Sequence, residues 1–330
     1  MEENTKTRIL RALRERDGFV SGQELCQDLG ISRTAVWKYI RQLEAEGYRL
    51  EAVPNRGYCL KAVPDILSES EIQSRLHTRW VGRKVVCLAE VDSTNLRARR
   101  LAEEGAPSGT LVAADRQTKG RGSRGRSWES PAGESIYMTL LLRPEFSPAS
   151  ASMLTLVMGL SAVQGMERVT GAPLQIKWPN DVVLNGKKVV GILTEMSAQV
   201  DYIEHLVIGV GVNVNGSEFP PELQDKATSL AAQLGRRFQR ARIAAAILEA
   251  FEKNYEIFLE TEDLSGLKDA YQQVLANAGK QVRVLDPVNP YSGRALGIDG
   301  RGQLLVQRED GTVERVYAGE VSVRGLYSYV

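Results

Sequence analysis

The sequence is poor in cysteine and histidine, and it carries almost no net charge. Its 330 residues include three cysteines and two histidines. The cysteines, Cys26, Cys59 and Cys87, form no CxxC pair, which excludes a zinc site or disulfide scaffold and predicts a reduced, cytoplasmic protein. The histidines, His77 and His205, show no partner pattern and are interpreted as ordinary side chains. A net charge of +1 excludes a whole-molecule field that attracts nucleic acid, so any DNA contact must come from a local patch.

A long apolar run is also lacking. The most apolar stretch, residues 153–166, is interrupted by polar residues and glycine, and we interpret it as a buried helix rather than a membrane span. The first ten residues lack the apolar core of a signal peptide. No membrane partner is therefore expected. The length allows two or three domains of ordinary globular composition.

Residues 1–63 are predicted to form a helix-turn-helix unit. Ser21 and Glu24 make a capping box that opens one helix, and Gly30 ends it. Ser32 caps the next helix. Two helices joined by a tight turn with glycine are typical of a DNA-binding helix-turn-helix.

A wing and a basic outer face complete this first domain. Strand-like residues 48–53 and 58–60 flank a Pro-Asn-Arg-Gly turn, which predicts a two-stranded wing with an arginine at its tip. Eleven Lys and Arg residues stand against nine Asp and Glu residues in this domain, so the positions of the cations matter more than their excess. The residues predicted to contact DNA are Ser32, Arg33, Thr34, Trp37, Lys38, Arg41 and Arg56. A protein-docking or vestigial winged helix remains an alternative.

Residues 65–277, after a Val-Pro-Asp linker, are predicted to form an α+β catalytic domain. Strand-like runs occur at 85–88, 111–114, 136–142, 187–196 and 205–214. Asn185-Gly186 is a strong signal for a two-residue hairpin and hence for antiparallel pairing. We expect a mixed or antiparallel sheet with helices, at 150–169 and 240–259, on one face. Residues 280–330 change to short strands with Asp-Gly turns, which predicts a small separate β-barrel.

The most informative stretch of the sequence is a loop rich in glycine and arginine, residues 120–128 (GRGSRGRSW). Glycine lets backbone amides approach an anion, and arginine pairs with phosphate or carboxylate oxygens through its forked guanidinium. A tryptophan beside such a loop can stack on a flat ring. The composition indicates a nucleotide site, although a solvated surface loop is about as plausible for this segment taken alone.

Four motifs in order give the sequence a family resemblance. They are DSTN at 92–95, QTKGRGSRGRSW at 117–128, KWPNDVVLNGKKVVGI at 177–192 and GVGVNVN at 209–215. Together they resemble biotin–protein ligases. With the winged helix in front, essentially the whole chain is similar to the bifunctional biotin ligases that also repress the biotin operon.

The resemblance implies a class II synthetase-like ligase core, an SH3-like C-terminal barrel and two functions. The first is activation of biotin with ATP and Mg²⁺ to biotinyl-5′-AMP, followed by transfer to a lysine of a biotin carboxyl carrier protein. The second is repression, in which the adenylate favours a homodimer that binds operator DNA of biotin genes. A free carboxylate is a poor electrophile, and adenylation supplies a leaving group, but two anions must then meet in a partly dry site that offers positive charge.

The resemblance also implies roles for individual residues. The catalytic residues are Lys188, Arg121 and Asp181, and Asp181 is also the candidate metal ligand. The biotin-binding residues are Ser93, Thr94, Asn95, Gln117, Arg121, Gly122, Ser123 and Lys188. The ATP- and adenylate-binding residues are Gly120, Arg124, Arg126, Trp128, Lys177, Asn180, Asn213 and Arg324.

Several of these residues have a simpler interpretation. A lysine near a hairpin turn, such as Lys188, is usually solvated, and Thr94 can serve only as a helix cap. Gly209 and Gly211 can merely relieve crowding in a strand. Ser123 stands where many relatives have another arginine, and a serine brings no charge to hold the adenylate.

Two other functions stay open from the sequence. One is a DNA-binding regulator that senses biotin but does not ligate it, although Lys177, Lys188 and the arginine loop are intact. The other is a ligase for lipoate or octanoate, which would need a longer and more apolar pocket.

Overall fold

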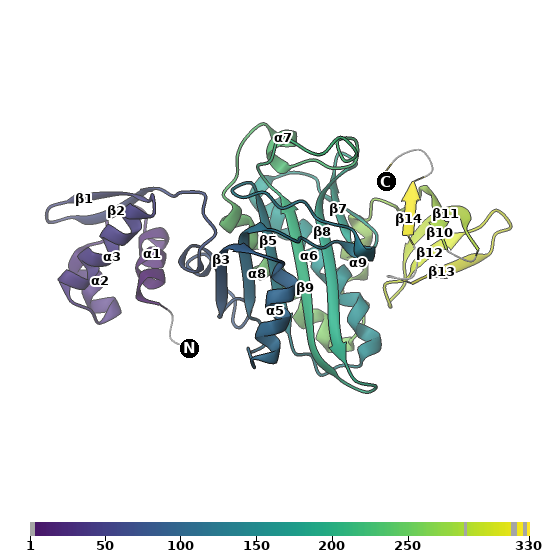
Figure 1. Cartoon of the computed structure of the whole chain (residues 1–330), viewed down its shortest axis with the longest axis horizontal. Helices are drawn as coiled ribbons and strands as arrows, with labels where there is room; N and C mark the ends of the chain where they lie inside the picture. Colours follow the sequence, from purple (N-terminus) through teal and green to yellow (C-terminus); the bar gives the residue numbers. More distant parts are fainter. Residues whose placement is uncertain (1–3, 287–288, 318–321, 326–328) are drawn as a thin grey trace.

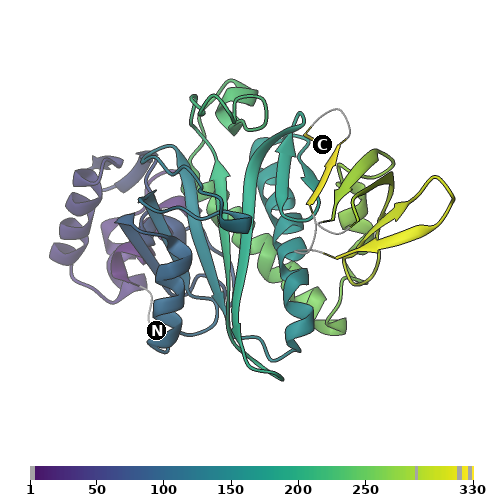
Figure 2. The same ribbon diagram turned by 45° about the vertical axis from the view of Figure 1, so that its right-hand side comes forward.

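The computed structural model describes residues 4–286, 289–317, 322–325 and 329–330, without the side chains of Arg124 and residues 322–324. Three units follow one another along the long axis of the molecule (Figures 1 and 2). A small helical unit comes first, a large sheet with helices lies in the middle, and a second, smaller sheet lies at the other end. This order confirms the predicted fold class.

The first unit is a winged helix-turn-helix. Its elements are α1 (Thr5–Glu15), α2 (Gly22–Leu29), α3 (Arg33–Ala45), β1 (Arg49–Val53) and β2 (Gly57–Ala62). The capping box of Ser21 and Glu24 is present, and Gly30 ends α2 at φ 66°. Ser32 accepts a hydrogen bond from the amide of Ala35, which starts α3. Apolar residues at helical spacing on the three helices pack into one small core.

The segment that joins the first two units is anchored, contrary to the expectation of a simple linker. Asp65 pairs with Arg240, which is 2% exposed and lies at the start of α8 (Arg240–Thr261). Glu71, in α4 (Glu69–Gln73), pairs with Arg14 of α1. The N-terminal unit is therefore docked on the central one.

The central sheet has seven strands in the order β3-β4-β5-β9-β8-β7-β6. The strands are β3 (Val85–Val91), β4 (Leu111–Gln117), β5 (Ser135–Leu142), β6 (Gln175–Lys177), β7 (Asp181–Leu184), β8 (Lys187–Ala198) and β9 (Ile203–Asn213). Only β3 and β4 pair in parallel, and the other neighbours are antiparallel. The predicted hairpin joins β7 to β8, with Asn185 at φ 50° and Gly186 at φ 76°.

The two long helices cover one face of this sheet, as predicted. They are α6 (Leu154–Thr170), which continues a 3-10 turn η2 (Pro148–Met153), and α8, and both share the main hydrophobic core with the sheet. The combined segment Pro148–Thr170 is long and apolar enough to cross a membrane, but 72% of its most apolar window is buried inside the protein. It is longer than the sequence pattern indicated because η2 leads directly into α6.

The opposite face of the sheet carries a shorter helix, α5 (Thr94–Glu103), and leaves room for a cavity. Val112, Leu141 and Val207 pack under α5, whereas their neighbours along the strands face the main core. The same alternation places Gly209, Gly211 and Asn213 of β9 on the α5 side. Two further short helices, α7 (Leu230–Leu234) and α9 (Lys268–Gln273), follow β9 in the chain.

The third unit is a five-stranded antiparallel sheet in the order β13-β12-β11-β10-β14. The strands are β10 (Gln281–Leu285), β11 (Tyr291–Ile298), β12 (Leu304–Gln307), β13 (Val313–Val316) and β14 (Ser322–Gly325). Within the described part of the chain, no pairing joins β13 to β14. Closure into an SH3-like barrel stays a prediction.

Candidate functional site

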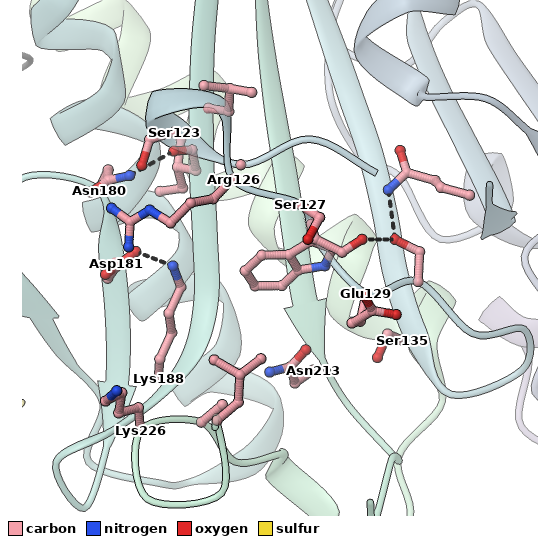
Figure 3. A pocket seen from close by; sticks show the side chains of 18 of the residues that line it. Ser123, Arg126, Ser127, Glu129, Ser135, Asn180, Asp181, Lys188, Asn213 and Lys226 are labelled. Carbon is pink, nitrogen blue, oxygen red and sulfur yellow. Dashed lines mark hydrogen bonds and ion pairs between the residues drawn. The ribbon is translucent and has the colours of Figure 1, made fainter. Parts of the chain in front are cut away.

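A large cavity opens on the α5 side of the central sheet, beside the glycine- and arginine-rich loop. Its volume is about 1640 Å³, and it is lined by that loop, the Lys177–Asp181 segment, β8, the end of β9 and residues 216–227 (Figure 3). A smaller cavity of about 40 Å³ adjoins it beneath the loop. Gln117, Ser123, Trp128 and Lys188 line both cavities. The two cavities form one continuous site.

All eight residues predicted to surround biotin line the smaller cavity. Ser93, Thr94 and Asn95 begin α5 and are at most 4% exposed. The amide and hydroxyl of Thr94 donate to Gln117 Oε1 at 2.9 and 3.1 Å. Thr94 therefore does more than start a helix, because it fixes Gln117 against the pocket. Ser93 is the N-cap residue, and its side chain makes no capping hydrogen bond.

Two residues that hold the side chains of this pocket were not predicted from the sequence, the buried Thr139 and the half-buried Glu195. The hydroxyl of Thr139 in β5 lies within hydrogen-bond distance of both the Thr94 hydroxyl and Asn95 Oδ1, at 2.8 and 2.7 Å. Glu195 of β8 accepts from Asn95 Nδ2 at 2.7 Å and pairs with Arg121 at 3.1 Å. The period of two along β8 is a signal that could have found Glu195, because it places Glu195 on the same face as Gly191.

Glycines form the floor of the smaller cavity. A Cβ atom on Gly191 or Gly211 would lie 2.6 Å from the ring of Trp128, and one on Gly209 would lie 2.1 Å from Asn95 Oδ1. Larger residues cannot occupy these positions without displacing Trp128 or Asn95. The glycines at alternate positions of β9 thus allow Asn95 and Trp128 to lie directly against the sheet. They do more than relieve crowding within the strand.

The loop itself is a short hairpin folded over this floor. The amide of Gly122 donates to Arg126 O at 2.7 Å, and the amide of Trp128 donates to Gly120 O at 3.0 Å. Gly120 has no room for a side chain, since a Cβ there would lie 2.2 Å from Trp128 O. Its predicted contact with nucleotide is accordingly limited to its backbone.

A charged cluster of Lys177, Asp181 and Lys188 lines the larger cavity, and Lys188 also lines the smaller one. Lys188 Nζ lies 2.5 Å from Asp181 Oδ1 and 5.1 Å from the centre of the Trp128 ring. Lys177 Nζ lies 4.0 Å from Asp181 Oδ2, and the hydroxyl of Tyr329 donates to the same oxygen at 2.5 Å. Figure 3 shows Arg126, Asp181 and Lys188 pointing toward one another.

Asp181 stays ionised in this cluster. Burial alone would raise the pKa of its carboxyl group, but the charges of Lys188 and Lys177 and the hydrogen bonds from Lys188 and Tyr329 outweigh burial, so the pKa lies below its usual value. One carboxylate among two lysines leaves the cluster with a net positive charge. Such a place suits the reaction of two anions.

The geometry at Asp181 does not fit a magnesium ion held by the protein. Its oxygens face Lys188, Lys177 and Tyr329. In the described ranges of the chain, no group of three His, Cys, Asp or Glu side chains could hold a metal ion. A magnesium ion prefers several oxygen ligands and retained water, and two neighbouring ammonium groups would repel it.

The residues predicted to bind the nucleotide line the larger cavity in part. Arg126, Trp128, Lys177, Asn180 and Asn213 do so. Asn180 Nδ2 donates to Ile192 O at 3.1 Å, and Asn213 Nδ2 donates to Thr228 O at 3.1 Å, so both amides are held by the backbone of the pocket wall. The side chains of Arg124 and Arg324 lie outside the described residues.

The residues predicted to bind DNA lie far from this pocket, on the N-terminal unit. All seven are exposed. Arg41 lies over the ring of Trp37, 5.4 Å from its centre, and pairs with Glu44 at 2.9 Å. Arg56, at the tip of the wing, lies over Phe19 at 4.3 Å. The recognition helix and wing thus present an exposed set of cations and one exposed tryptophan.

Sequence profiles of known families match each of the three units. The biotin/lipoate A/B protein ligase family matches residues 88–213, an HTH domain matches residues 5–59, and the biotin protein ligase C terminal domain matches residues 278–324.

Similar proteins match over nearly the full chain. The bifunctional ligase/repressor BirA of Bacillus spizizenii is 42% identical over 307 residues, 92% of this chain and 94% of that protein. The Escherichia coli protein of the same description is 30% identical over 98% of this chain and 99% of its own. Among solved structures, the biotin protein ligase of Aquifex aeolicus in complex with biotin and ATP is 35% identical with a TM-score of 0.65, covering 74% of this chain and 99% of that chain.

Proposed function

The chain belongs to the biotin protein ligase family, among its bifunctional ligase/repressors, and from this premise we propose that it joins biotin to ATP and passes the biotinyl group to a carrier protein. In the first step a biotin carboxylate oxygen attacks the α-phosphorus of ATP, and pyrophosphate leaves. In the second step the amine of a carrier lysine attacks the acyl carbon, loses a proton, and AMP leaves. The carrier is a biotin carboxyl carrier protein.

The observation that carries this proposal is the Lys177–Asp181–Lys188 cluster, which lines the larger cavity and reaches the smaller one through Lys188. The smaller cavity offers hydroxyl and amide groups suited to a neutral ureido ring, which needs both donors and acceptors. The larger cavity has the size and the cations for ATP. The carboxylate of a molecule in the first and the α-phosphate of a molecule in the second would both lie near Lys188.

We assign the residues of the site as follows. Ser93, Thr94, Asn95 and Gln117 hold the ureido ring, and Lys188 holds the biotin carboxylate and the acyl phosphate. Arg126 and Lys177 meet the triphosphate. Trp128 and Asn213 hold the adenine, and Asp181 orients the two lysines rather than a metal ion.

Pyrophosphate release with ATP, magnesium and biotin, followed by transfer of label to a biotin carrier domain, tests this function. Release and transfer together support the ligase. If operator DNA were bound but no pyrophosphate released, the chain would be a regulator that senses biotin. Equal turnover with lipoate would contradict the choice of biotin.

Repression is the second half of the proposal. The exposed cations and tryptophan on α3 and the wing bind operator DNA of biotin genes. Biotinyl-5′-AMP favours a homodimer that spans two half-sites of the operator. A ligand that binds better to the dimerisation-competent state must strengthen dimerisation by the same factor. We place this chemistry in the cytoplasm, with no membrane partner.

Carrier protein and a second copy of the chain compete for one surface in this scheme. Sedimentation of the adenylate-bound protein, with and without carrier, measures the competition. If carrier left dimerisation unaffected, this part of the proposal would be wrong.

A further inference from the structure

Among the described side chains of the C-terminal unit, that of Tyr329 reaches the catalytic pocket. Tyr329 lines the larger cavity together with Lys177, Asp181 and Lys188. Its hydroxyl donates to Asp181 Oδ2 at 2.5 Å, and Lys177 Nζ lies 3.5 Å from the centre of its ring. The two contacts place one aromatic residue between an anion and a cation of the pocket.

This contact belongs to a packed interface around the segment that carries Lys177 and Asp181. The amide of Trp178 donates to Asn277 Oδ1 at 2.9 Å, and its indole Nε1 donates to Gly302 O at 3.0 Å. Trp178 is 1% exposed. Val330, next to Tyr329, packs against Val183 and Ala276. Residues just before the C-terminal unit, a turn within it and its last residue therefore hold this segment in place.

The distances around Asp181 separate the two lysines. Lys188 is in direct contact with Oδ1, whereas Lys177 is 4.0 Å from Oδ2, where the Tyr329 hydroxyl takes the close position. An ammonium group over an aromatic face is attracted by the ring. Tyr329 thus satisfies the carboxylate oxygen and, with its ring, holds the Lys177 ammonium apart from it.

We propose that Tyr329 is a positioning residue for ATP, which keeps Lys177 directed at the triphosphate instead of collapsed onto Asp181. The inference rests on the proposed adenylation reaction. Without the hydroxyl, the buried Oδ2 atom would draw in Lys177, whose ammonium group lies 4.0 Å away, because an unsatisfied buried carboxylate oxygen is costly. ATP would then have to break an ion pair before it could bind.

Tyr329→Phe tests this proposal because it keeps the ring and removes only the hydroxyl. In ATP–pyrophosphate exchange by the full chain, we expect the KM for ATP to rise about tenfold, the usual effect of one hydrogen bond to a charged group. The kcat and the KM for biotin should stay within about twofold. Calorimetric titration with ATP alone, without biotin, should show the same loss. Tyr329→Ala, which also removes the ring, should weaken ATP binding about a hundredfold.

Tyr317→Phe is the matched control, since Tyr317 is a 52% exposed tyrosine of the same unit and lies away from the pocket. It should bind ATP as the unchanged chain does. An unchanged KM for ATP in Tyr329→Phe would overturn the proposal, as would a fall in kcat alone. If the unchanged chain catalysed no exchange, the proposed function would fail, whereas the ATP titrations would still decide the role of Tyr329.

Discussion

Lys188 is the residue that we place closest to both reacting groups in the pocket. Its side chain is 22% exposed, and its ammonium group lies in direct contact with Asp181 and faces the ring of Trp128. A lysine paired with a buried carboxylate is already desolvated and oriented before any substrate arrives. The arrangement therefore supplies charge to a reacting anion without the cost of ordering a free side chain.

Lys188→Ala should impair adenylation far more than folding. We expect pyrophosphate release to fall about a hundredfold or more, because one preorganised charge at a developing anion is removed. The melting temperature should change little, since the lysine is not part of the hydrophobic core. Lys253→Ala, which removes an exposed lysine of α8, is the control. Unchanged pyrophosphate release in Lys188→Ala would refute the role.

We predict that Ser123 affects how firmly the loop retains the adenylate. It lines both cavities and carries no charge, and Arg121 beside it is paired with Glu195. Ser123→Arg would add a guanidinium near the acyl phosphate, and we expect biotinyl-5′-AMP to dissociate about tenfold more slowly. Ser123→Ala should stay within about twofold. Stopped-flow chase experiments measure both rates, and equal rates for the two variants would exclude a charge effect at this position.

The sequence could predict pocket residues where they lie in a motif and not where they come from a distant segment. Ser93, Gln117 and Lys188 occupy the cavities that their motifs indicated. Tyr329 shares the pocket with Asp181 only because the C-terminal unit packs against β7, and no local pattern encodes that packing. Contacts between units depend on tertiary packing, and the hydrophobic periodicity of the sequence does not reveal that packing.

At the scale of elements, α3 separates its two faces cleanly. Val36, Ile40 and Leu43 are buried in the core of the N-terminal unit, while Arg33 and Arg41 are exposed. A helix with this pattern can dock in a DNA groove without disturbing its own core. Its exposed cations are the groups that we propose for the phosphate contacts.

The double variant Arg33→Ala, Arg41→Ala should weaken operator binding and leave ligation intact. Each lost phosphate contact should lower the salt slope of the binding constant by about one. Arg41 is partly neutralised by Glu44, so its share should be the smaller of the two. Electrophoretic mobility or anisotropy measurements at several salt concentrations give the slope, with Arg99→Ala on α5 as the control. A parallel loss of ligase activity would show that the two functions are not separable.

Helices and strands were predicted well where one of their faces is exposed to solvent. They were predicted less well where they are buried on both faces, because the alternation of apolar and polar residues is then lost. The β7–β8 hairpin was clear because its Asn-Gly turn allows positive φ. The parallel pairing of β3 with β4 and the position of α5 were not foreseen. Strand order depends on which hydrophobic faces meet, and several arrangements satisfy the same alternation.

At the scale of the whole molecule, the N-terminal unit is held by buried charges rather than by a free tether. Glu71 is 1% exposed, and it pairs with Arg14 and Arg75 and accepts a hydrogen bond from Tyr48 at 2.5 Å. Arg11 adds a hydrogen bond to the carbonyl of Gln73 at 2.6 Å. A fixed orientation of this unit allows a dimer to present two recognition helices at a set spacing.

Glu71→Gln should therefore undock the N-terminal unit. Removing the buried carboxylate leaves Arg14 and Arg75 without their common anion, a change that costs about 3 kcal/mol. We expect faster proteolysis between residues 63 and 68 and weaker operator binding, because the dimer must then order both recognition helices on DNA. Ligation should be largely retained, since Glu71 does not line the catalytic pocket. Glu69→Gln, an exposed glutamate of the same short helix, is the matched control. If both variants resisted protease and bound operator equally, docking through Glu71 would not govern the DNA-binding unit.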